Sequence, residues 1–174
     1  MITEQITENR WLLYDDPRLL DWCAERIASL ENAEAWHKQG AQALGIADGG
    51  NILAVMVIHG FQRVYKDCSL SMAADSPNWA SRTIIQKLLD YPFNRLGVNR
   101  ITTHTASKNR RALRFNEGIG FVREGLLRQG CGDDDLVICG LLRGDAIAGG
   151  WLIPKGLADD VEIVHTSQSM VVTA

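Results

Sequence analysis

ITTHTASKNRRALRFNEGIGFVREGLL, residues 101–127, is the stretch of this sequence that decides the fold. Its β-branched beginning, Arg100–Thr105, predicts a strand, and Ser107 is a good cap for a helix that follows. Apolar residues at helical spacing mark one face of that helix, and Gly120 is typical of its end. Phe121–Arg128 predicts the next strand. A helix between two strands indicates that the strands run parallel.

The sequence on either side of this unit predicts a mixed sheet. Asp48-Gly49-Gly50-Asn51 is a strong hairpin turn, so the strands that flank it are expected to be antiparallel. Pro92 lies inside an amphipathic helix and is expected to kink its last turn. The fold class is therefore α/β (α+β), with about six to seven strands and helices packed on the sheet. The predicted elements outside the opening unit are strands over 10–14, 41–47, 52–59, 68–74 and 136–142, and helices over about 17–30 and 76–97.

The pattern changes after Arg143, which predicts a domain over 1–143 with a C-terminal extension over 144–174. Residues 144–150 indicate a linker. The extension fits an arm across the domain, a strand exchanged in a homodimer or a loose segment, so the sequence leaves a monomer and a homodimer open. Short strand-like runs in it occur at 151–154, 161–165 and 170–173.

Composition limits the class of protein. Apolar runs are shorter than the ~20 residues of a membrane span, and Met1–Arg10 has no apolar signal core. A cytoplasmic location without membrane association is therefore expected. The cysteines are expected to be reduced, mostly buried thiols rather than zinc ligands or disulfide partners, because no Cys-x-x-Cys pair occurs. They are Cys23, Cys68, Cys131 and Cys139.

Charge is distributed unevenly along the chain. Residues 1–60 contain 4 Lys or Arg and 9 Asp or Glu, a net charge of −5. Residues 61–128 contain 12 and 5, a net charge of +7, and residues 129–174 contain 2 and 7, a net charge of −5. A basic island between acidic flanks favours a ligand that bears phosphates over a long nucleic acid, which the flanks would repel. A solvated basic face would carry the same charge.

Two helix starts are expected to lie together at one edge of the sheet, at residues 76–83 and 107–111. There the first N–H groups of each helix and its dipole attract anions. This arrangement predicts a site for a ligand with several phosphates. Basic residues stand at both starts, Arg82 at the first and Lys108, Arg110 and Arg111 at the second.

The run from Asn109 to Phe121, followed by Glu124-Gly125 and Arg128, resembles the Asn…Ser/Ala…Glu-x-x-Gly-Phe…Glu-Gly…Arg run of GNAT acetyltransferases. It is most similar to the bacterial subgroup that acetylates protein N-termini and small amines. Tyr91–Ile101 resembles the helix-to-strand stretch before that run, and the whole resemblance covers roughly residues 9–143. It implies a mixed, centrally splayed sheet with helices on both faces, acetyl-CoA as the cosubstrate and no metal.

The resemblance also implies a site for acetyl-CoA. The strand that ends at Ala74 would lend backbone groups to the pantetheine arm, and the turn before the next helix would cradle the pyrophosphate. Asn109 would hydrogen-bond the arm, and Ala112 and Phe115 would line its thiol and adenosine side. The implied site residues are Met72, Ala73, Ala74, Trp79, Ala80, Ser81, Arg82, Thr83, Asn109, Arg110, Ala112 and Phe115.

The activity that the resemblance implies is transfer of an acetyl group from acetyl-CoA to a primary amine by direct attack. The acceptor, a small molecule or a protein N-terminus or lysine, is not identified by the sequence, and nucleic acid is not expected. Attack needs a neutral amine and so a proton acceptor. His104 and Asp75 are the candidate catalytic residues. Their structural alternatives are a surface or cross-strand histidine for His104 and a helix or turn cap for Asp75. His59 is expected to be structural.

Two positions depart from the family pattern. Arg82 replaces a glycine of the phosphate turn, and Asn116 stands where many members have a tyrosine that protonates the leaving thiolate. Together with the extension over 144–174, these departures leave a second hypothesis open. It is a catalytically inactive binding or interaction module on the same scaffold, with CoA binding lost or purely structural.

Overall fold

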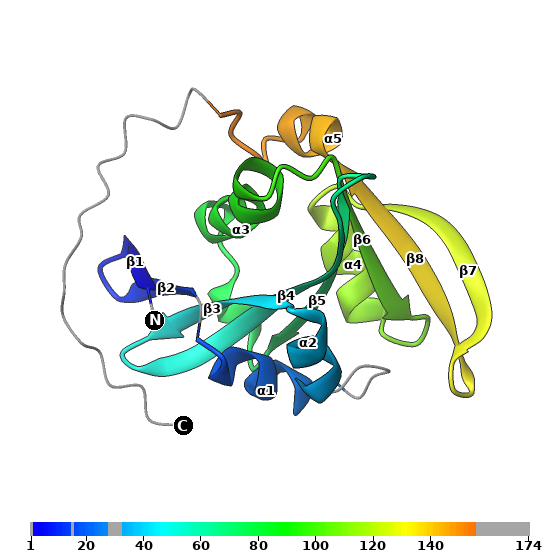
Figure 1. The fold of residues 1–174 in the computed structure, drawn as a ribbon, viewed down its shortest axis with the longest axis horizontal. Coiled ribbons are helices and arrows are strands. Elements are labelled where there is room, and N and C mark those ends of the chain that lie inside the picture. The colour runs from blue at the N-terminus through cyan, green and yellow to red at the C-terminus, as the bar shows by residue number, and fades with distance from the viewer. Residues whose placement is uncertain (1, 15, 28–32, 156–174) are drawn as a thin grey trace.

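The computed structural model of the protein describes residues 2–14, 16–27 and 33–155. The expected helix position Leu30 and the strand-like runs at 161–165 and 170–173 lie outside the described residues. The strands are β1 (Ile2–Thr7), β2 (Arg10–Tyr14), β3 (Gln42–Asp48), β4 (Asn51–Gln62), β5 (Asp67–Ala74), β6 (Arg100–Ala106), β7 (Val122–Cys131) and β8 (Asp134–Leu142). They form one sheet in the order β1-β2-β3-β4-β5-β6-β8-β7 (Figure 1).

The sheet is mixed, as the sequence predicts. All neighbouring strands are antiparallel except β5 and β6, which run parallel. The described strands number eight, one more than the upper limit of six to seven, because β1 was missed. This strand is polar and lies at the edge of the sheet, where Glu4 accepts a hydrogen bond from Tyr14 of β2. A polar edge strand lacks the alternating apolar pattern on which strand prediction rests.

The helices cover both faces of the sheet. α1 (Arg18–Ala24) and α2 (Ala33–Gln39) supply Leu19 and Trp36 to a buried cluster on one face. α3 (Arg82–Asp90), α4 (Arg110–Gly118) and α5 (Arg143–Ala148) pack into the larger cluster on the other face. The expected helix over 17–30 is therefore wrong in length, since α1 ends at Ala24.

Local signals in the sequence are confirmed at two turns. The turn Gly49-Gly50 joins β3 to β4, and both glycines have positive φ, 55° and 94°, which other residues rarely adopt. Pro92 stands in a π-helical turn, Tyr91–Arg95, that follows α3 directly. There Leu96 N–H donates to the carbonyl of Tyr91 at 3.0 Å. Proline thus changes the geometry of the helix at its last turn.

The residues expected to form a linker after Arg143 form a helix instead. α5 buries Ala146, and Leu152 beyond it is also buried, so this segment adds to the core on the α3 face. The Arg143 guanidinium donates to the Phe93 carbonyl, and Gln86 Nε2 donates to the Gly150 carbonyl at 2.8 Å. The described part of the extension is therefore packed on the domain. The division between 1–143 and 144–174 stays a prediction.

Three further features concern membrane spans, clusters of metal-binding side chains and the cysteines. No described helix is long and apolar enough to cross a membrane. Within the described ranges no three His, Cys, Asp or Glu side chains gather as a metal site would require. All four cysteines are free thiols, and Cys23, Cys68 and Cys139 are buried.

Phe93 and Phe61 form a matched pair for testing the larger core. Phe93 is 0% exposed and Phe61 is 44% exposed. We expect Phe93→Ala to lower the free energy of unfolding by about 3–5 kcal/mol, because it empties a closed site. Phe61→Ala should cost less than about 1 kcal/mol. Urea denaturation measures both, and equal losses would contradict the packing described above.

The thiols provide a second test. Burial raises the pKa of the Cys23 and Cys68 thiols to about 12, whereas Cys131 is only half-buried. Because the thiolate is the reactive form, we expect one thiol of the folded protein to react rapidly with Ellman's reagent and four after denaturation. Cys131→Ser should remove the fast phase alone. A fast phase that survives this substitution would show that a buried cysteine is accessible.

Candidate functional site

The parallel strands β5 and β6 part halfway along their length. Their register runs from Asp67 opposite Arg100 to Leu70 opposite Thr103, and there it ends. Beyond that point β5 stays paired with β4 as far as Ala74, and β6 stays paired with β8 as far as Ala106. Each strand follows its outer neighbour, so the inner backbone groups of 71–74 and 104–106 face an opening in the sheet. The splayed centre that the resemblance implies is thus present.

Both strands lead from this opening toward a helix. β5 is followed by a short 3-10 helix, η1 (Pro77–Trp79), and then by α3, and β6 is followed by α4, so the N-termini of α3 and α4 lie at the open end of the parting strands. Of the implied pantetheine residues, Met72 and Ala74 pack against the α3 face, and Ala73 is buried against the α1 face. Their backbone, rather than their side chains, borders the opening.

The turn before α3 presents backbone donors. Ser81 caps the helix by accepting from the Ile84 N–H at 3.3 Å, and its carbonyl accepts from Ile85 N–H. The N–H groups of Arg82 and Thr83, in the first turn, have no partner within an α-helix. Trp79 is buried and packs against Phe115 of α4, with ring centroids 5.6 Å apart. The Trp79 side chain therefore joins the segment before α3 to α4.

Arg82 points away from its own helix start toward the C-terminal segment. Its guanidinium donates to the Gly150 carbonyl at 2.9 Å and lies 4.2 Å from the centre of the Trp151 ring. The side chain thus holds the segment after α5 against α3. This placement leaves the first-turn N–H groups of α3 as the local anion donors.

The residue that caps α4 differs from the one that the sequence predicts. Asn109, not Ser107, is the cap, and its side-chain oxygen accepts from Ala112 N–H at 3.1 Å. The Ser107 hydroxyl donates to Asp134 at 2.7 Å, and the same carboxylate accepts from Lys108 N–H. These hydrogen bonds lower the pKa of Asp134 and tie the β6–α4 loop to the β7–β8 turn.

Asn116 has a structural role in this chain. Its amide donates to the hydroxyls of Thr103 and Thr105, at 3.2 and 3.4 Å, and so fastens α4 to the splayed half of β6. Thr103 and Thr105 therefore face α4, and His104 between them faces the opposite side of the sheet, where it is exposed.

The two candidate catalytic residues lie apart. Asp75 follows β5 and forms an ion pair with Arg26, which lies just after α1, 2.7 Å from its Nε. His104 stands on β6, across the opening from β5. The structure does not bring the two side chains into one hydrogen-bonded group among the described contacts, and both assignments stay predictions.

His59 and Ser71, a pair that the sequence did not single out, lie beside the opening. His59 Nε2 is 3.0 Å from Ser71 Oγ, and Ser71 is the first residue of β5 beyond the parallel register. The His59 ring also lies 6.0 Å from the Trp36 ring of α2. The sequence could not predict this pair, because His59 and Ser71 are twelve residues apart and only the register of β4 and β5 brings them together.

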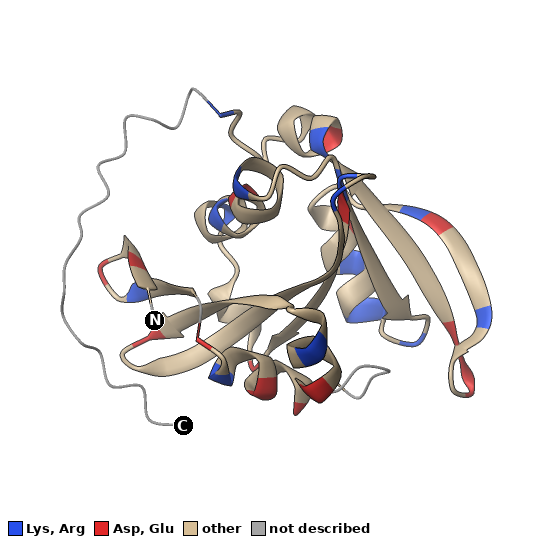
Figure 2. Ribbon diagram, in the orientation of Figure 1, with Lys and Arg blue, Asp and Glu red and all other residues tan. Residues whose placement is uncertain are grey.

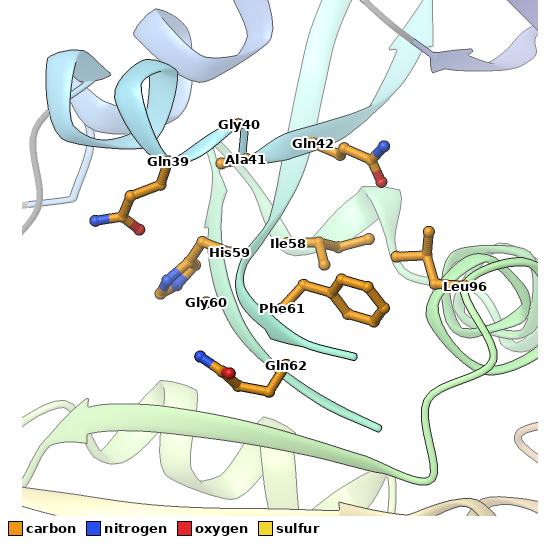
Figure 3. Close-up of a pocket in the computed structure, with 10 residues that line it drawn as sticks. All are labelled: Gln39, Gly40, Ala41, Gln42, Ile58, His59, Gly60, Phe61, Gln62 and Leu96. Atoms are coloured by element: carbon orange, nitrogen blue, oxygen red, sulfur yellow. The ribbon is translucent and has the colours of Figure 1, made fainter. Parts of the chain in front are cut away.

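A pocket of about 580 Å³ adjoins the same histidine (Figure 3). It lies where β4 continues past the beginning of β3, since Ile58 is the last residue of β4 opposite Gln42. Figure 3 shows Ile58, Phe61 and Leu96 on one side of the strand and His59 on the other. Its lining residues include no Asp, Glu, Lys or Arg: Gln39, Gly40, Ala41, Gln42, Ile58, His59, Gly60, Phe61, Gln62 and Leu96.

Comparison with known proteins identifies the fold. No protein-family model and no curated protein matches the sequence. A solved probable acetyltransferase is 21% identical, with a TM-score of 0.64, and the match covers 83% of this chain and 98% of that one. The spermidine/spermine N-acetyltransferase SpeG from Vibrio cholerae, solved with manganese ions, is 17% identical, with a TM-score of 0.65 and coverage of 83% and 98%. A dodecameric structure of the Vibrio cholerae spermidine enzyme is 20% identical, with a TM-score of 0.62 and coverage of 79% and 96%.

These likenesses run through nearly the whole length of the solved chains. At such identities they establish architecture. The protein has the mixed α+β fold of the GNAT acetyltransferases.

Proposed function

We propose that this protein transfers an acetyl group from acetyl-CoA to a primary amine. The observation that carries the proposal is the parting of β5 and β6 after Leu70 and Thr103, with two helix N-termini at its open end. An extended, amide-bearing arm such as pantetheine can pair with the inner edge of β5 as a strand would. The solved structures of similar fold include acetyltransferases that act on spermidine, which is an amine.

The charges near the helix starts support a ligand with several phosphates. Figure 2 shows Lys and Arg residues along α4, where Arg110, Arg111 and Arg114 follow the Asn109 cap. Arg110 and Arg111 are exposed and available for an anion. At α3 the donors would be the backbone N–H groups of residues 82 and 83, which suit a pyrophosphate at a helix N-terminus. Arginine at position 82 is compatible with a phosphate at these N–H groups, because its side chain points away from them and donates to the carbonyls of Gly149 and Gly150.

Catalysis would rest mainly on position and on backbone donors. The thioester carbonyl would lie at the apex of the opening, where a β5 N–H can stabilise the oxyanion that forms on attack. Holding amine and thioester together in one site supplies much of the rate. The position where relatives of this fold often carry tyrosine is occupied by Asn116, whose amide binds Thr103 and Thr105. The leaving thiolate would therefore take its proton from the attacking nitrogen or from solvent.

Binding of acetyl-CoA is the first test. We expect calorimetry to show one site per chain, and millimolar acetyl-CoA to raise the midpoint of thermal unfolding by mass action. Release of the CoA thiol in the presence of a primary amine would then establish turnover. Binding without turnover for any amine would favour the inactive binding module. If acetyl-CoA gives no heat in calorimetry and no shift in thermal unfolding, the proposed acetyl-CoA site is wrong.

Two substitutions of one residue test the turn before α3. Ser81 has φ −114° and ψ 161°, which a following proline accepts, and proline is favoured at the first helical position. Arg82→Pro therefore removes one backbone N–H, while Arg82→Ala removes only the side chain. We expect Arg82→Ala to bind acetyl-CoA within about threefold of the parent and Arg82→Pro at least about tenfold more weakly, as loss of one hydrogen bond to a charged group predicts.

The comparison is made by calorimetry on variants whose far-ultraviolet circular dichroism and thermal unfolding match. Both variants lose the contacts with Gly150 and Trp151, so any difference between them belongs to the backbone. An equal loss of affinity in both would mean that the arginine side chain binds the phosphate.

A further inference from the structure

We propose that one face of the β6-β8-β7 half of the sheet, the face opposite α4, binds a second copy of this chain, so that two sheets stack in a homodimer. The inference goes beyond the proposed acetyl transfer and does not depend on it. It rests on three features of the described residues: the strands that α1 and α2 cover, the exposed aliphatic side chains beyond them and an ion pair at the centre of the face.

α1 and α2 cover the other half of this side of the sheet. They pack on β3 and β4, and the strand residues of the buried cluster beneath them come from β2, β3, β4 and β5. β6, β8 and β7 lie beyond β5 at one end of the sheet, and Figure 1 shows β8 and β7 extending away from both helices. The part of the chain that the structure describes thus leaves this face of β6, β8 and β7 without a covering helix.

The strand pattern of β8 decides which of its side chains lie on this face. Val137, Cys139 and Leu141 belong to the core under α3 and α4. Since side chains alternate along a strand, the residues of β8 that alternate with these three point to the opposite face. They are Leu136, Ile138, Gly140 and Leu142.

β7 adds two further aliphatic side chains. Val122 is paired with Gly140 and so lies on the same face, and Leu127 lies there too because it is paired with Leu136. Val122 is 57% exposed, Leu127 49% and Leu142 of β8 46%. The solvated face of an antiparallel sheet ordinarily carries polar residues. Exposed aliphatic side chains on two neighbouring strands therefore indicate a surface of contact.

An ion pair lies at the centre of this face. The Arg100 guanidinium of β6 donates to the Glu124 carboxylate of β7 at 2.9 Å, and the two side chains meet above Gly140 of β8. Their side chains stay 30% and 36% exposed. His104 of β6 lies on the same face, nearer the opening. The centre of the face thus presents one cation and one anion, with aliphatic side chains around them.

A second copy complements this arrangement. Sheets that stack face to face lie about 10 Å apart, with their strand directions within about 30° of each other. A twofold axis along β8 places β6 of one copy over β7 of the other. Each Arg100 then meets the Glu124 of the other copy, and the aliphatic residues of β8 meet their counterparts. Because opposite charges meet at both positions, the face is complementary to itself.

Sedimentation equilibrium of the full chain tests the proposal. We expect a dimer at about 50 µM. Leu127→Arg and Leu126→Arg are a matched pair, because the two leucines are 49% and 54% exposed and point to opposite faces of β7. Leu127→Arg buries a cation at two places of a twofold interface, so it should weaken the dimer at least about 100-fold. Leu126→Arg should stay within about threefold of the parent.

A second matched pair locates the contact on the molecule. Val122 lies on the proposed face, whereas Val64 lies in the turn between β4 and β5 and is 86% exposed. Val122→Arg should dissociate the dimer and Val64→Arg should leave it intact. The reverse result would place the contact at the β4–β5 turn and overturn the proposal. Equal losses in Leu126→Arg and Leu127→Arg would also overturn it, because they indicate pairing along the edge of β7.

Charge reversal tests the pairing of Arg100 with Glu124 across the axis. Arg100→Glu leaves two anions at the centre of the face and Glu124→Arg leaves two cations, so each variant alone should be monomeric. An equimolar mixture should form a mixed dimer, because opposite charges then meet again. Far-ultraviolet circular dichroism checks that both variants are folded. Folded variants that form no mixed dimer would overturn the charge pairing.

The mass of the parent protein gives the simplest outcome. A monomer at about 50 µM overturns the proposal, and so does a dimer that survives both Leu127→Arg and Val122→Arg. A dimer that these two substitutions dissociate, and that the two control substitutions leave intact, supports it. Sedimentation uses no acetyl-CoA, so none of these results bears on the proposed acetyl transfer.

Discussion

The parting of β5 from β6 is the constraint on which the rest of the structure depends. Each strand is held along its whole length by one antiparallel neighbour, β4 or β8, and the two share a parallel register only at their beginnings. Sheets twist, so two strands that follow different outer neighbours diverge unless they also pair with each other. The opening is therefore built from ordinary strand pairing on either side of it.

Several contacts keep the opening from closing. On the α3 side, Trp79, which precedes α3, packs against Phe115 of α4. Asn116 fastens α4 to the far half of β6 through two threonine hydroxyls. On β8, Gly140 has no side chain, and a Cβ there would lie 2.5 Å from the Glu124 carboxylate and 2.7 Å from the Arg100 guanidinium. The ion pair between Arg100 of β6 and Glu124 of β7 can thus cross over β8 and join the two strands on either side of it.

The C-terminal segment contributes to the site from a distance. Arg143, Gln86 and Arg82 bind it to the π-helical turn and to α3, and Trp151 packs under the Arg82 guanidinium. Arg82, which stands where the GNAT motif that this sequence resembles has glycine, therefore has a partner elsewhere in the chain. Asn116, which stands where that motif often has tyrosine, has a structural contact too, because its amide donates to two threonine hydroxyls of β6.

Much of the architecture follows from local sequence. The β-branched run before Ser107, the glycine pair at 49–50 and Pro92 each specify a strand, a turn or a change of helix geometry through the conformations that those residues allow. Parallel β5 and β6 follow from the helix between them. The sequence did not predict the polar edge strand β1, which depends on its pairing with β2. It also did not predict the helix after Arg143, which depends on the burial of residues such as Ala146 rather than on periodicity.

The candidate site likewise combines features that the sequence predicts with features that only the tertiary structure determines. Its basic helix starts and the backbone of β5 could be placed from the sequence, because element order alone brings them to one edge of the sheet. The direction of the Arg82 side chain, the cap at Asn109 and the contact of His59 with Ser71 were decided by tertiary structure. Each depends on which distant residue comes within about 3 Å, the reach of a hydrogen bond, and that distance is set by register and packing.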